Sequence, residues 1–475
     1  MYKSKTNKGC SKFHEQLKIN HIWIKGRIHM KNISKDKLKK YERSFNQNEN
    51  KVITNTVTKN GFFKSCENYD EIRNARYEFS VNLKQGNITN QKQSGRCWIF
   101  ASTNFLRYFL IKKLNINTIE LSQNYIAFYD KLEKCNYFLN NIIDSIDRPT
   151  TDRHVTFFLD APINDGGQWD MFLNIIKKYG IVPKSAMPET YSSSNTSEIN
   201  KILKRILRMY AYELRTSYKN KKNLEELENQ KLDMLENIYA ILCTAFGRPP
   251  EKFDFEYTDK NDEFHRDSDI TPTEFYDKYI KDLNLDDYIS IINAPNEDRP
   301  FYKKYTVNYI GNVADGNRIT YLNLPIERLK EMAIAQLSEG VPVFFGSDVG
   351  QESSRELGIL SRNLYNIKDI INIKDTMDKA TKLEYRESAM THAMMFLGVN
   401  LDENWKGNRW KVENSWGDAS GNKGIYLLTD EWFNSYVYQV VINKKHLKPE
   451  ELEAYNENKY YMELEPWDPM GTLAD

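Results

Sequence analysis

The chain has 475 residues, and its 67 basic and 66 acidic residues leave a formal net charge of only +1. Such a balance gives no global electrostatic attraction for a nucleic acid. The five cysteines are odd in number and scattered, which argues against a disulfide framework and for a reducing compartment. Because no apolar run reaches the roughly 18 residues of a membrane span, we expect a cytoplasmic protein of two or three lobes.

The first 30 residues are basic, with seven Lys or Arg residues and one Glu. No apolar core of roughly 7–15 residues follows these charges, so the segment lacks the pattern of a secretory signal. We expect residues 1–30 to be a disordered extension, although a basic tail can also contact a nucleic acid or an acidic surface. Met30 is a second candidate start, and the sequence leaves the choice between Met1 and Met30 open.

A helix is predicted around Asp36–Phe45, followed by loops and short extended pieces up to residue 90. The segment Gln91–Cys97 then reads Gln-Lys-Gln-Ser-Gly-Arg-Cys and leads into an apolar stretch. Apolar side chains at positions 98, 101, 105, 106, 109 and 110 have helical spacing, which predicts a buried helix after Cys97. The positive end of that helix would favour the thiolate of Cys97, which is the nucleophilic form.

The segment Asp165–Trp169 reads Asp-Gly-Gly-Gln-Trp and precedes a predicted helix over Trp169–Tyr179. Gly166 and Gly167 fit a simple turn before this helix. They also fit a place where a substrate backbone comes close, because glycine has no Cβ. Farther along, apolar positions at helical spacing over residues 195–245 predict an antiparallel pair of helices.

From about residue 340 the pattern changes to short β-strands. We predict them over residues 341–345, 393–399, 410–414, 424–428 and 437–442. His392 immediately precedes the second of these strands, and Asn414 ends the third. The histidine and asparagine thus belong to a β lobe and Cys97 to a helical lobe, which predicts a site in the cleft between them.

Cys97, His392 and Asn414 in this chain order, with Gln91 before the cysteine, are the components of a papain-like thiol hydrolase. His392 would pair with the thiolate and protonate the leaving amine, and Asn414 would orient the imidazole. Gln91 would donate its side-chain amide to the oxyanion, together with the backbone N–H of Cys97. Each residue alone also fits an ordinary structural role, as a core thiol, a core imidazole or a strand end. Their order and neighbours favour the catalytic interpretation.

Longer motifs around these residues resemble the bleomycin hydrolase and aminopeptidase C family. The motifs are residues 90–98, 120–125, 390–394, 410–417 and the ending Pro-Trp-Asp-Pro-Met-Gly at 466–471. The similarity runs from about residue 31 to Asp475. It implies an α+β fold, namely a papain-like two-lobe cysteine peptidase with a helical lobe, an antiparallel β-barrel-like lobe and a large helical insertion.

The patterns and the resemblance together predict five segments along the chain. Cys97 and His392 are 295 residues apart, far more than in a minimal papain fold, so an insertion must separate the catalytic halves. The predicted segments are a basic extension (1–30), an N-terminal part with the helical catalytic lobe (31–190), a helical insertion (191–335), a β-rich catalytic lobe (336–465) and a C-terminal arm (466–475).

The resemblance implies an intracellular cysteine aminopeptidase that removes N-terminal residues from peptides through a thioester on Cys97. Deamidation of bleomycin-like amides is implied as a side reaction, and a homohexamer as the assembly. The arm would lie in the cleft, with the terminal carboxylate of Asp475, or of Ala474 after trimming, facing the free amine of the substrate. Gly166 and Gly167 would bind the substrate backbone, and Trp98 and Trp416 would pack around the site.

No metal or organic cofactor is predicted, since histidine and cysteine residues are too sparse and scattered for a metal site. Two other functions stay open. An endopeptidase with the same chemistry would require displacement of the arm. A non-catalytic protein could bind a nucleic acid through the basic N-terminus, but retention of Cys97, His392, Asn414 and Gln91 argues against it.

Overall fold

The structure is a computed structural model, and it describes residues 32–84, 86–457 and 461–474. The predicted extension over residues 1–30 and the terminal Asp475 therefore lie outside the described residues. The chain divides into two compact units, Met1–Cys66 and Glu67–Asp475. All four predicted catalytic residues belong to the second unit.

The described part of the first unit is helical. It contains α2 (Lys35–Asn48), α3 (Lys51–Asn60) and α4 (Phe62–Ser65). The helix predicted around Asp36–Phe45 is confirmed as α2, but the loops and extended pieces predicted after it are wrong over α3. The Asn50 side chain caps that helix by accepting hydrogen bonds from the backbone N–H groups of Val52 and Ile53.

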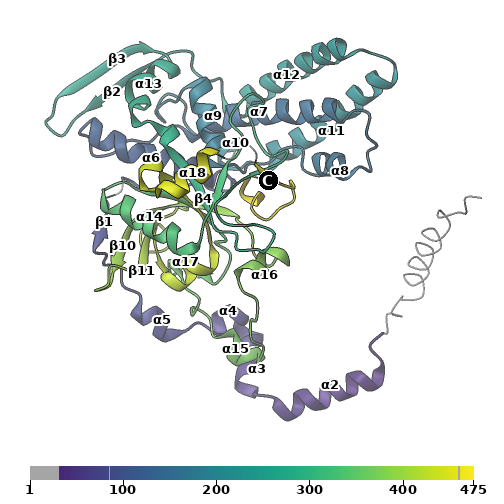
Figure 1. The fold of residues 1–475 in the computed structure, drawn as a ribbon, viewed down its shortest axis with the longest axis vertical. Helices are drawn as coiled ribbons and strands as arrows, with labels where there is room; N and C mark the ends of the chain where they lie inside the picture. Colours follow the sequence, from purple (N-terminus) through teal and green to yellow (C-terminus); the bar gives the residue numbers. More distant parts are fainter. Residues whose placement is uncertain (1–31, 85, 458–460, 475) are drawn as a thin grey trace, which may run out of the picture. The chain divides into compact units, whose positions relative to one another are not determined.

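Helices dominate the second unit up to residue 246. They are α5 (Tyr69–Asn74), α6 (Cys97–Lys113), α7 (Gln123–Asp144), α8 (Arg153–Asp160), α9 (Trp169–Tyr179), α10 (Tyr191–Ser194), α11 (Ser197–Lys219) and α12 (Leu224–Phe246). α9 has the predicted bounds, and α11 and α12 form the predicted pair. Both pack against α7 and lie alongside it (Figure 1), because one apolar stripe of each helix is buried.

A 12-stranded sheet is the other main part of the second unit (Figure 1), in the order β14-β5-β6-β4-β13-β7-β10-β11-β12-β9-β8, with β1 paired to β10. Most neighbours are antiparallel, whereas β4–β6, β5–β14 and β9–β12 are parallel. The strands are β1 (Val81–Asn82), β4 (Tyr288–Ile292), β5 (Lys303–Val307), β6 (Tyr321–Asn323), β7 (Val343–Ser347), β8 (Ser353–Ser354), β9 (Ile359–Leu360), β10 (His392–Leu401), β11 (Gly407–Glu413), β12 (Ile425–Thr429), β13 (Val437–Asn443) and β14 (Met462–Leu464).

The structure differs from the predicted helical insertion over residues 191–335, which also contains strands. A hairpin of β2 (Phe253–Thr258) and β3 (Phe264–Ile270) follows α12, and β4, β5 and β6 then join the large sheet. All five residues of β4 are buried. A short, fully buried strand has no alternation to reveal it, so its sequence pattern resembles that of a buried helical turn. The predicted boundaries at residues 190, 335 and 465 stay predictions.

Six further helices flank the strands: α13 (Pro272–Tyr279), α14 (Ile326–Ser338), α15 (Ile367–Ile371), α16 (Lys379–Glu384), α17 (Asp430–Tyr436) and α18 (Pro449–Glu457). The core between helices and sheet is aromatic. Phe105 on α6 makes edge contacts, with ring centroids 5.2 Å apart, to both Trp169 and Tyr288. The Trp169 indole also donates to the Tyr288 carbonyl at 3.1 Å. This contact fixes α6 and α9 against β4 and so holds the helical wall beside the sheet.

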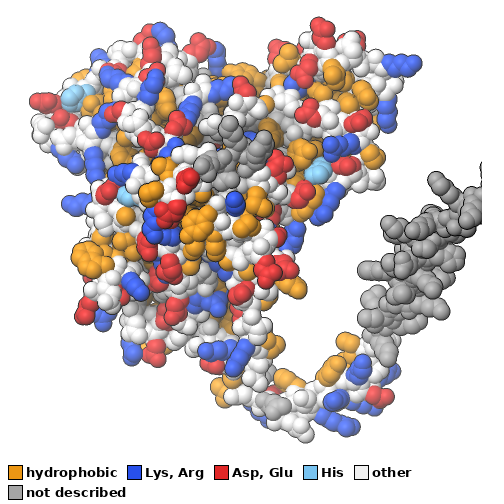
Figure 2. All heavy atoms as spheres, viewed as in Figure 1, with side chains coloured by type: hydrophobic (Ala, Val, Ile, Leu, Met, Phe, Trp, Pro, Cys, Tyr) orange, Lys and Arg blue, Asp and Glu red, His pale blue; other side chains and the backbone are white. Residues whose placement is uncertain are grey.

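Basic and acidic side chains are interspersed over the face of the molecule that Figure 2 shows. Of the helices in the described ranges, none combines the length and the apolar character that crossing a membrane requires.

Candidate active site

Cys97 is the first residue of α6, and its side chain is only 4% exposed. The backbone N–H of Ala393 donates to the Cys97 sulfur at 3.5 Å, which places the start of β10 directly against the thiol. Arg96 directly precedes Cys97 in the chain. It is buried and forms two hydrogen bonds with the Glu189 carboxylate, at 3.1 and 2.8 Å. This bidentate ion pair fixes the turn from which the helix begins.

His392 faces the side-chain oxygen of Asn414, with 3.0 Å between Nε2 and Oδ1. The backbone N–H of Ser415 donates to the same oxygen at 2.8 Å. A flipped amide would set its NH₂ group against that N–H, so the oxygen must face the ring. Nε2 of His392 therefore carries the proton, and a neutral imidazole keeps its lone pair on Nδ1. The Trp416 ring packs 5.0 Å from the His392 ring, at 33°.

The Gln91 side chain is buried and held at both ends. Its oxygen accepts from the Ser415 hydroxyl at 2.6 Å, and its nitrogen donates to the Ser94 carbonyl at 2.6 Å. The backbone N–H of Gln91 also donates to the Ser415 carbonyl at 2.8 Å. Because an amide nitrogen has two hydrogens, one stays available for an oxyanion. Sequence reasoning missed Ser415, which fixes both Gln91 and Asn414.

Burial disfavours the charged forms of both reacting groups. It raises the pKa of the Cys97 thiol to about 11. It lowers the pKa of His392 to about 4, although the hydrogen bond with Asn414 acts in the opposite direction. In this closed site the thiol and the imidazole are therefore both neutral at pH 7. The predicted thiolate–imidazolium pair requires one proton transfer that creates both charges together.

Two glycines and the end of the chain meet beside the helix start. The backbone N–H of Gly167 donates to the Leu473 carbonyl at 2.9 Å. A Cβ on Gly166 would lie 2.4 Å from that same oxygen, and a Cβ on Gly167 would lie 2.3 Å from the Trp98 ring. Both positions therefore require glycine, one because the chain end is close and one because Trp98 packs beneath it. The Trp98 indole donates to the Asp165 carbonyl at 2.7 Å.

The last residues are docked rather than frayed. Two hydrogen bonds of 3.2 and 2.7 Å join Arg299 to Asp468, and Trp467 lies under the Arg153 guanidinium at 3.7 Å. Met470 is completely buried, and Ala474 is also buried. A Cβ on Gly166 would also lie 3.1 Å from backbone atoms of Ala474, so the structure brings these two residues together. The role of Ala474 in substrate binding stays a prediction, and Asp475 lies outside the described residues.

Sequence reasoning missed a buried polar network that ties the catalytic elements together. Arg107 on α6 pairs with Glu413 on β11, and Asn104 donates to the same carboxylate at 3.0 Å. Glu413 is the last residue of β11 and directly precedes Asn414, so the network couples the helix that starts at Cys97 to the strand that leads into Asn414. The signal was present in the sequence: an arginine in an apolar helix and a glutamate in an apolar strand both indicate a buried partner.

Asp165 and Lys134 organise the glycine turn. Asp165 accepts from the Gly95 N–H at 2.9 Å and pairs with Lys131 at 2.7 Å. Lys134 pairs with Asp130 at 2.9 Å and also donates to the Gly166 carbonyl. The turn that meets the chain end is thereby fixed to α7 and to the loop before Cys97.

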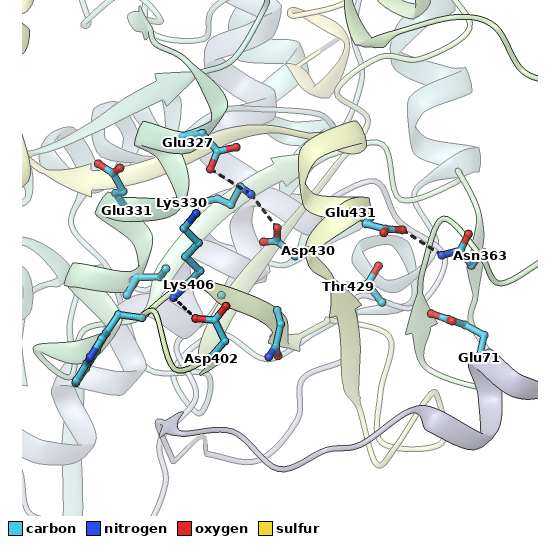
Figure 3. Close-up of a pocket in the computed structure, with 14 residues that line it drawn as sticks. Glu71, Glu327, Lys330, Glu331, Asn363, Asp402, Lys406, Thr429, Asp430 and Glu431 are labelled. Atoms are coloured by element: carbon cyan, nitrogen blue, oxygen red, sulfur yellow. Dashed lines mark hydrogen bonds and ion pairs between the residues drawn. The ribbon is translucent and has the colours of Figure 1, made fainter.

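A separate cavity of about 560 Å³ lies beside β11, β12 and α17 (Figure 3), and its described lining includes none of the four predicted catalytic residues. Its lining is mostly charged, and Lys330 pairs there with Asp430 at 2.8 Å and Glu327 at 3.4 Å. No cysteine or histidine is among the described residues that line it. It therefore lacks the groups for thiol chemistry.

Asp259, Glu263 and His265 bring potential metal-ligand atoms within 4.8 Å of one another at the β2–β3 turn. The Asp259 carboxylate accepts from the N–H groups of Asn261 and Glu263 at 2.9 and 3.0 Å. These bonds explain Asp259 as the residue that closes the turn.

A family model described as the peptidase C1-like family matches residues 32–471. The chain belongs to this family. Aminopeptidase C of Streptococcus thermophilus is 45% identical over 423 residues, covering 89% of this chain and 94% of that protein. Bleomycin hydrolase of Mus musculus is 39% identical, with 89% and 94% covered.

The crystal structure of PepW from Lactobacillus rhamnosis HN001 superposes with a TM-score of 0.91 at 45% identity, covering 93% of this chain and 99% of that one. The predicted family and the papain-like α+β fold are thereby confirmed. This peptidase C1-like protein is a cysteine-type aminopeptidase, as the sequence predicted.

Proposed function

We propose that Cys97 carries the reaction and that Leu473 and Ala474 limit it to the first residue of a peptide. In this proposal Nδ1 of His392 takes the thiol proton, and the thiolate attacks the carbonyl of the N-terminal residue. His392 then returns the proton to the leaving amine, and water hydrolyses the thioester. Asn414 orients the imidazole, and Gln91 and the Cys97 N–H bind the oxyanion.

The observation that carries this proposal is the hydrogen bond from the Gly167 N–H to the Leu473 carbonyl, at 2.9 Å. The chain's own end uses the backbone donor that a longer substrate would need. Room is then left for only one substrate residue before the scissile bond. A carboxylate at the chain end would attract the free ammonium of that residue and exclude an acylated one.

The test compares one aminoacyl fluorogenic amide with a free and with an acetylated α-amine, under reducing conditions. We expect cleavage of the free-amine form and at least roughly 100-fold slower cleavage of the acetylated form. Deletion of residues 472–475 should restore cleavage of the acetylated form. Asp475→Asn is the matched control, since it keeps the terminal carboxylate, and the intact mass shows whether residue 475 remains.

Equal cleavage of both forms by the full chain would contradict gating and would favour the endopeptidase. If neither form is cleaved while Cys97 is reduced, a binding role becomes the better hypothesis.

The cellular compartment is inferred from the chemistry of the thiol. We propose that the enzyme acts on peptides inside the cell, because a catalytic thiolate survives only under reducing conditions. None of the four cysteines in the described ranges forms a disulfide, which supports this setting. A homohexamer stays a proposal by resemblance, which sedimentation of the full chain would test.

A further inference from the structure

A second cavity, of about 650 Å³, adjoins the candidate active site. Its walls come from the loop that holds Gln91, from α10 and from the turn after β8. Asn90, which lines it, pairs with Trp416 across an isolated β-bridge. One wall residue of the cavity is thus paired with Trp416, whose ring packs against His392.

The cavity is lined by two cations and no carboxylate among the described residues. The cations are Lys92 and Arg355, and both side chains are exposed. Polar and aromatic residues complete the wall, including Gln93, Tyr191 and Asn195. No salt bridge joins Lys92 or Arg355 to an acidic side chain in the described part of the chain. An unneutralised pair of cations in a concave site raises the local concentration of anions.

Arg355 lies close to the reacting groups. Its guanidinium carbon is 4.9 Å from the centroid of the Trp416 ring, and that ring is 5.0 Å from the His392 ring. The guanidinium therefore lies within about 10 Å of the imidazole. An extended peptide advances roughly 3.3–3.6 Å per residue, so a separation of up to about 10 Å is spanned by at most two or three residues.

The direction of the leaving peptide follows from the roles of its neighbours. His392 protonates the leaving amine, so the leaving peptide starts at the imidazole. The backbone site at Gly167 is taken by Leu473, and none of the described residues 461–474 lines this cavity. Ring contacts lead from His392 over Trp416 to Arg355, which lines the cavity together with Lys92.

We propose that Lys92 and Arg355 form an anion subsite for a carboxylate of the leaving peptide, two or three residues beyond the scissile bond. This inference rests on the proposed function. Its consequence is specificity: tripeptides and tetrapeptides with a free C-terminus are favoured, because their α-carboxylate reaches the two cations. A longer peptide gains the same contact only through an acidic side chain at that position.

The test measures kcat/KM for release of the N-terminal residue from matched tetrapeptides, one with a free C-terminal carboxylate and one amidated. We expect a preference of roughly 3- to 10-fold for the free acid, mostly through KM, since exposed charge pairs contribute modestly. The preference should shrink in high salt. An amidated peptide with glutamate at the third or fourth position tells a side-chain carboxylate from the α-carboxylate, and either gain supports the anion subsite.

Variants assign the effect to these residues. Arg355→Gln and Lys92→Asn should each reduce the acid-to-amide ratio, and the double variant should bring it to about 1. Asparagine suits position 92 because Lys92 has a φ of 55°. Arg355→Lys should keep most of the ratio, and Arg355→Glu should invert it. Lys219→Met, at the exposed end of α11, is the control for loss of a distant positive charge and should leave the ratio unchanged.

The outcomes separate this inference from the function on which it rests. Cleavage of acid and amide at equal rates by the full chain would overturn the anion subsite and leave the aminopeptidase intact. An acid-to-amide ratio that stays unchanged in the Lys92→Asn, Arg355→Gln double variant would also overturn the anion subsite. Failure to release the N-terminal residue from any peptide would instead refute the proposed function.

Discussion

Individual side chains at the candidate site are held by partners that fix their chemistry. The Ser415 N–H turns the Asn414 oxygen towards His392 and thereby sets the proton on Nε2. The Ser415 hydroxyl holds the other end of the site through Gln91. One serine therefore fixes both Asn414, which contacts the imidazole, and Gln91, the proposed oxyanion donor.

Substitution of the imidazole should cost more than substitution of the group that orients it. We expect His392→Ala to lower kcat by roughly 10²–10⁴-fold, because it removes the acid–base group. Asn414→Ala should cost less, since the imidazole can still visit its working orientation. Steady-state kinetics on an aminoacyl amide measures both, and Cys97→Ala supplies the inactive reference. An Asn414→Ala loss equal to that of His392→Ala would contradict the assigned roles.

The Gln91 amide should act on the transition state alone. We expect Gln91→Ala to lower kcat by roughly 10²–10³-fold with little change in KM, because the oxyanion exists only after attack. Ser415→Ala should lower kcat less, as it loosens the amide without removing it. A change confined to KM would show that Gln91 binds the substrate in its ground state instead.

The exposure of Cys97 to water should control the protonation of its thiol. Because burial raises the pKa of Cys97 to about 11, the full chain should alkylate slowly at pH 7 and faster as the pH rises. Deletion of residues 472–475 should shift the increase in alkylation rate to lower pH, so that alkylation at pH 7 becomes roughly tenfold faster. Iodoacetamide labelling across pH measures this. An increase by the same factor at every pH would mean that deletion changed access alone.

At the scale of elements, buried ion pairs join segments that periodicity alone cannot bring together. Asp165 links the loop before α6 to Lys131 on α7 and to Thr196 and Asn200 at the start of α11. Burial would raise the pKa of Asp165, but Lys131 and these hydrogen bonds outweigh it and hold the pKa well below its usual range.

A carboxyl with a depressed folded-state pKa stabilises the fold above its unfolded pKa of about 4, and loses that contribution as the pH falls further. We therefore expect Asp165→Asn to lower the free energy of unfolding at pH 7 by about 3–5 kcal/mol. The difference from the unsubstituted chain should shrink below about pH 4. Denaturant unfolding at pH 7 and pH 3 measures it, with Asp262→Asn at the exposed β2–β3 turn as the control. Equal destabilisation at both pH values would refute the ionic contribution.

At the scale of the whole molecule, the end of the chain returns to the start of the catalytic helix. Met470 is completely buried. Its backbone carbonyl accepts a hydrogen bond of 3.3 Å from the hydroxyl of Tyr321, which lies on β6. A strand inside the segment that sequence analysis predicted to be a helical insertion thus helps to hold the residues proposed to gate the site.

Loosening this anchor should relax specificity without removing the catalytic groups. Met470→Ala leaves a cavity under the chain end, which costs about 2–5 kcal/mol of local packing. We expect faster cleavage of the acetylated substrate, while the free-amine substrate is still cleaved. Met462→Ala on β14, where the side chain is 39% exposed, is the matched control. An unchanged ratio of the two rates would show that the anchor does not limit access.

The sequence by itself determined the candidate residues: Cys97 at a helix start, His392 just before one strand, Asn414 at the end of another, and Gln91 on a polar loop. In the structure His392 begins β10 and Asn414 directly follows β11. The sequence also predicted α6, α9, the α11–α12 pair and five strands, because periodicity is a local property that neighbouring residues carry. Only the tertiary structure decided the placement of β4–β6 in the sheet, the docking of Ala474 at Gly166 and the approach of Arg355 to Trp416. These depend on contacts between residues far apart in the chain, whose energies come from burial and pairing that no single segment encodes.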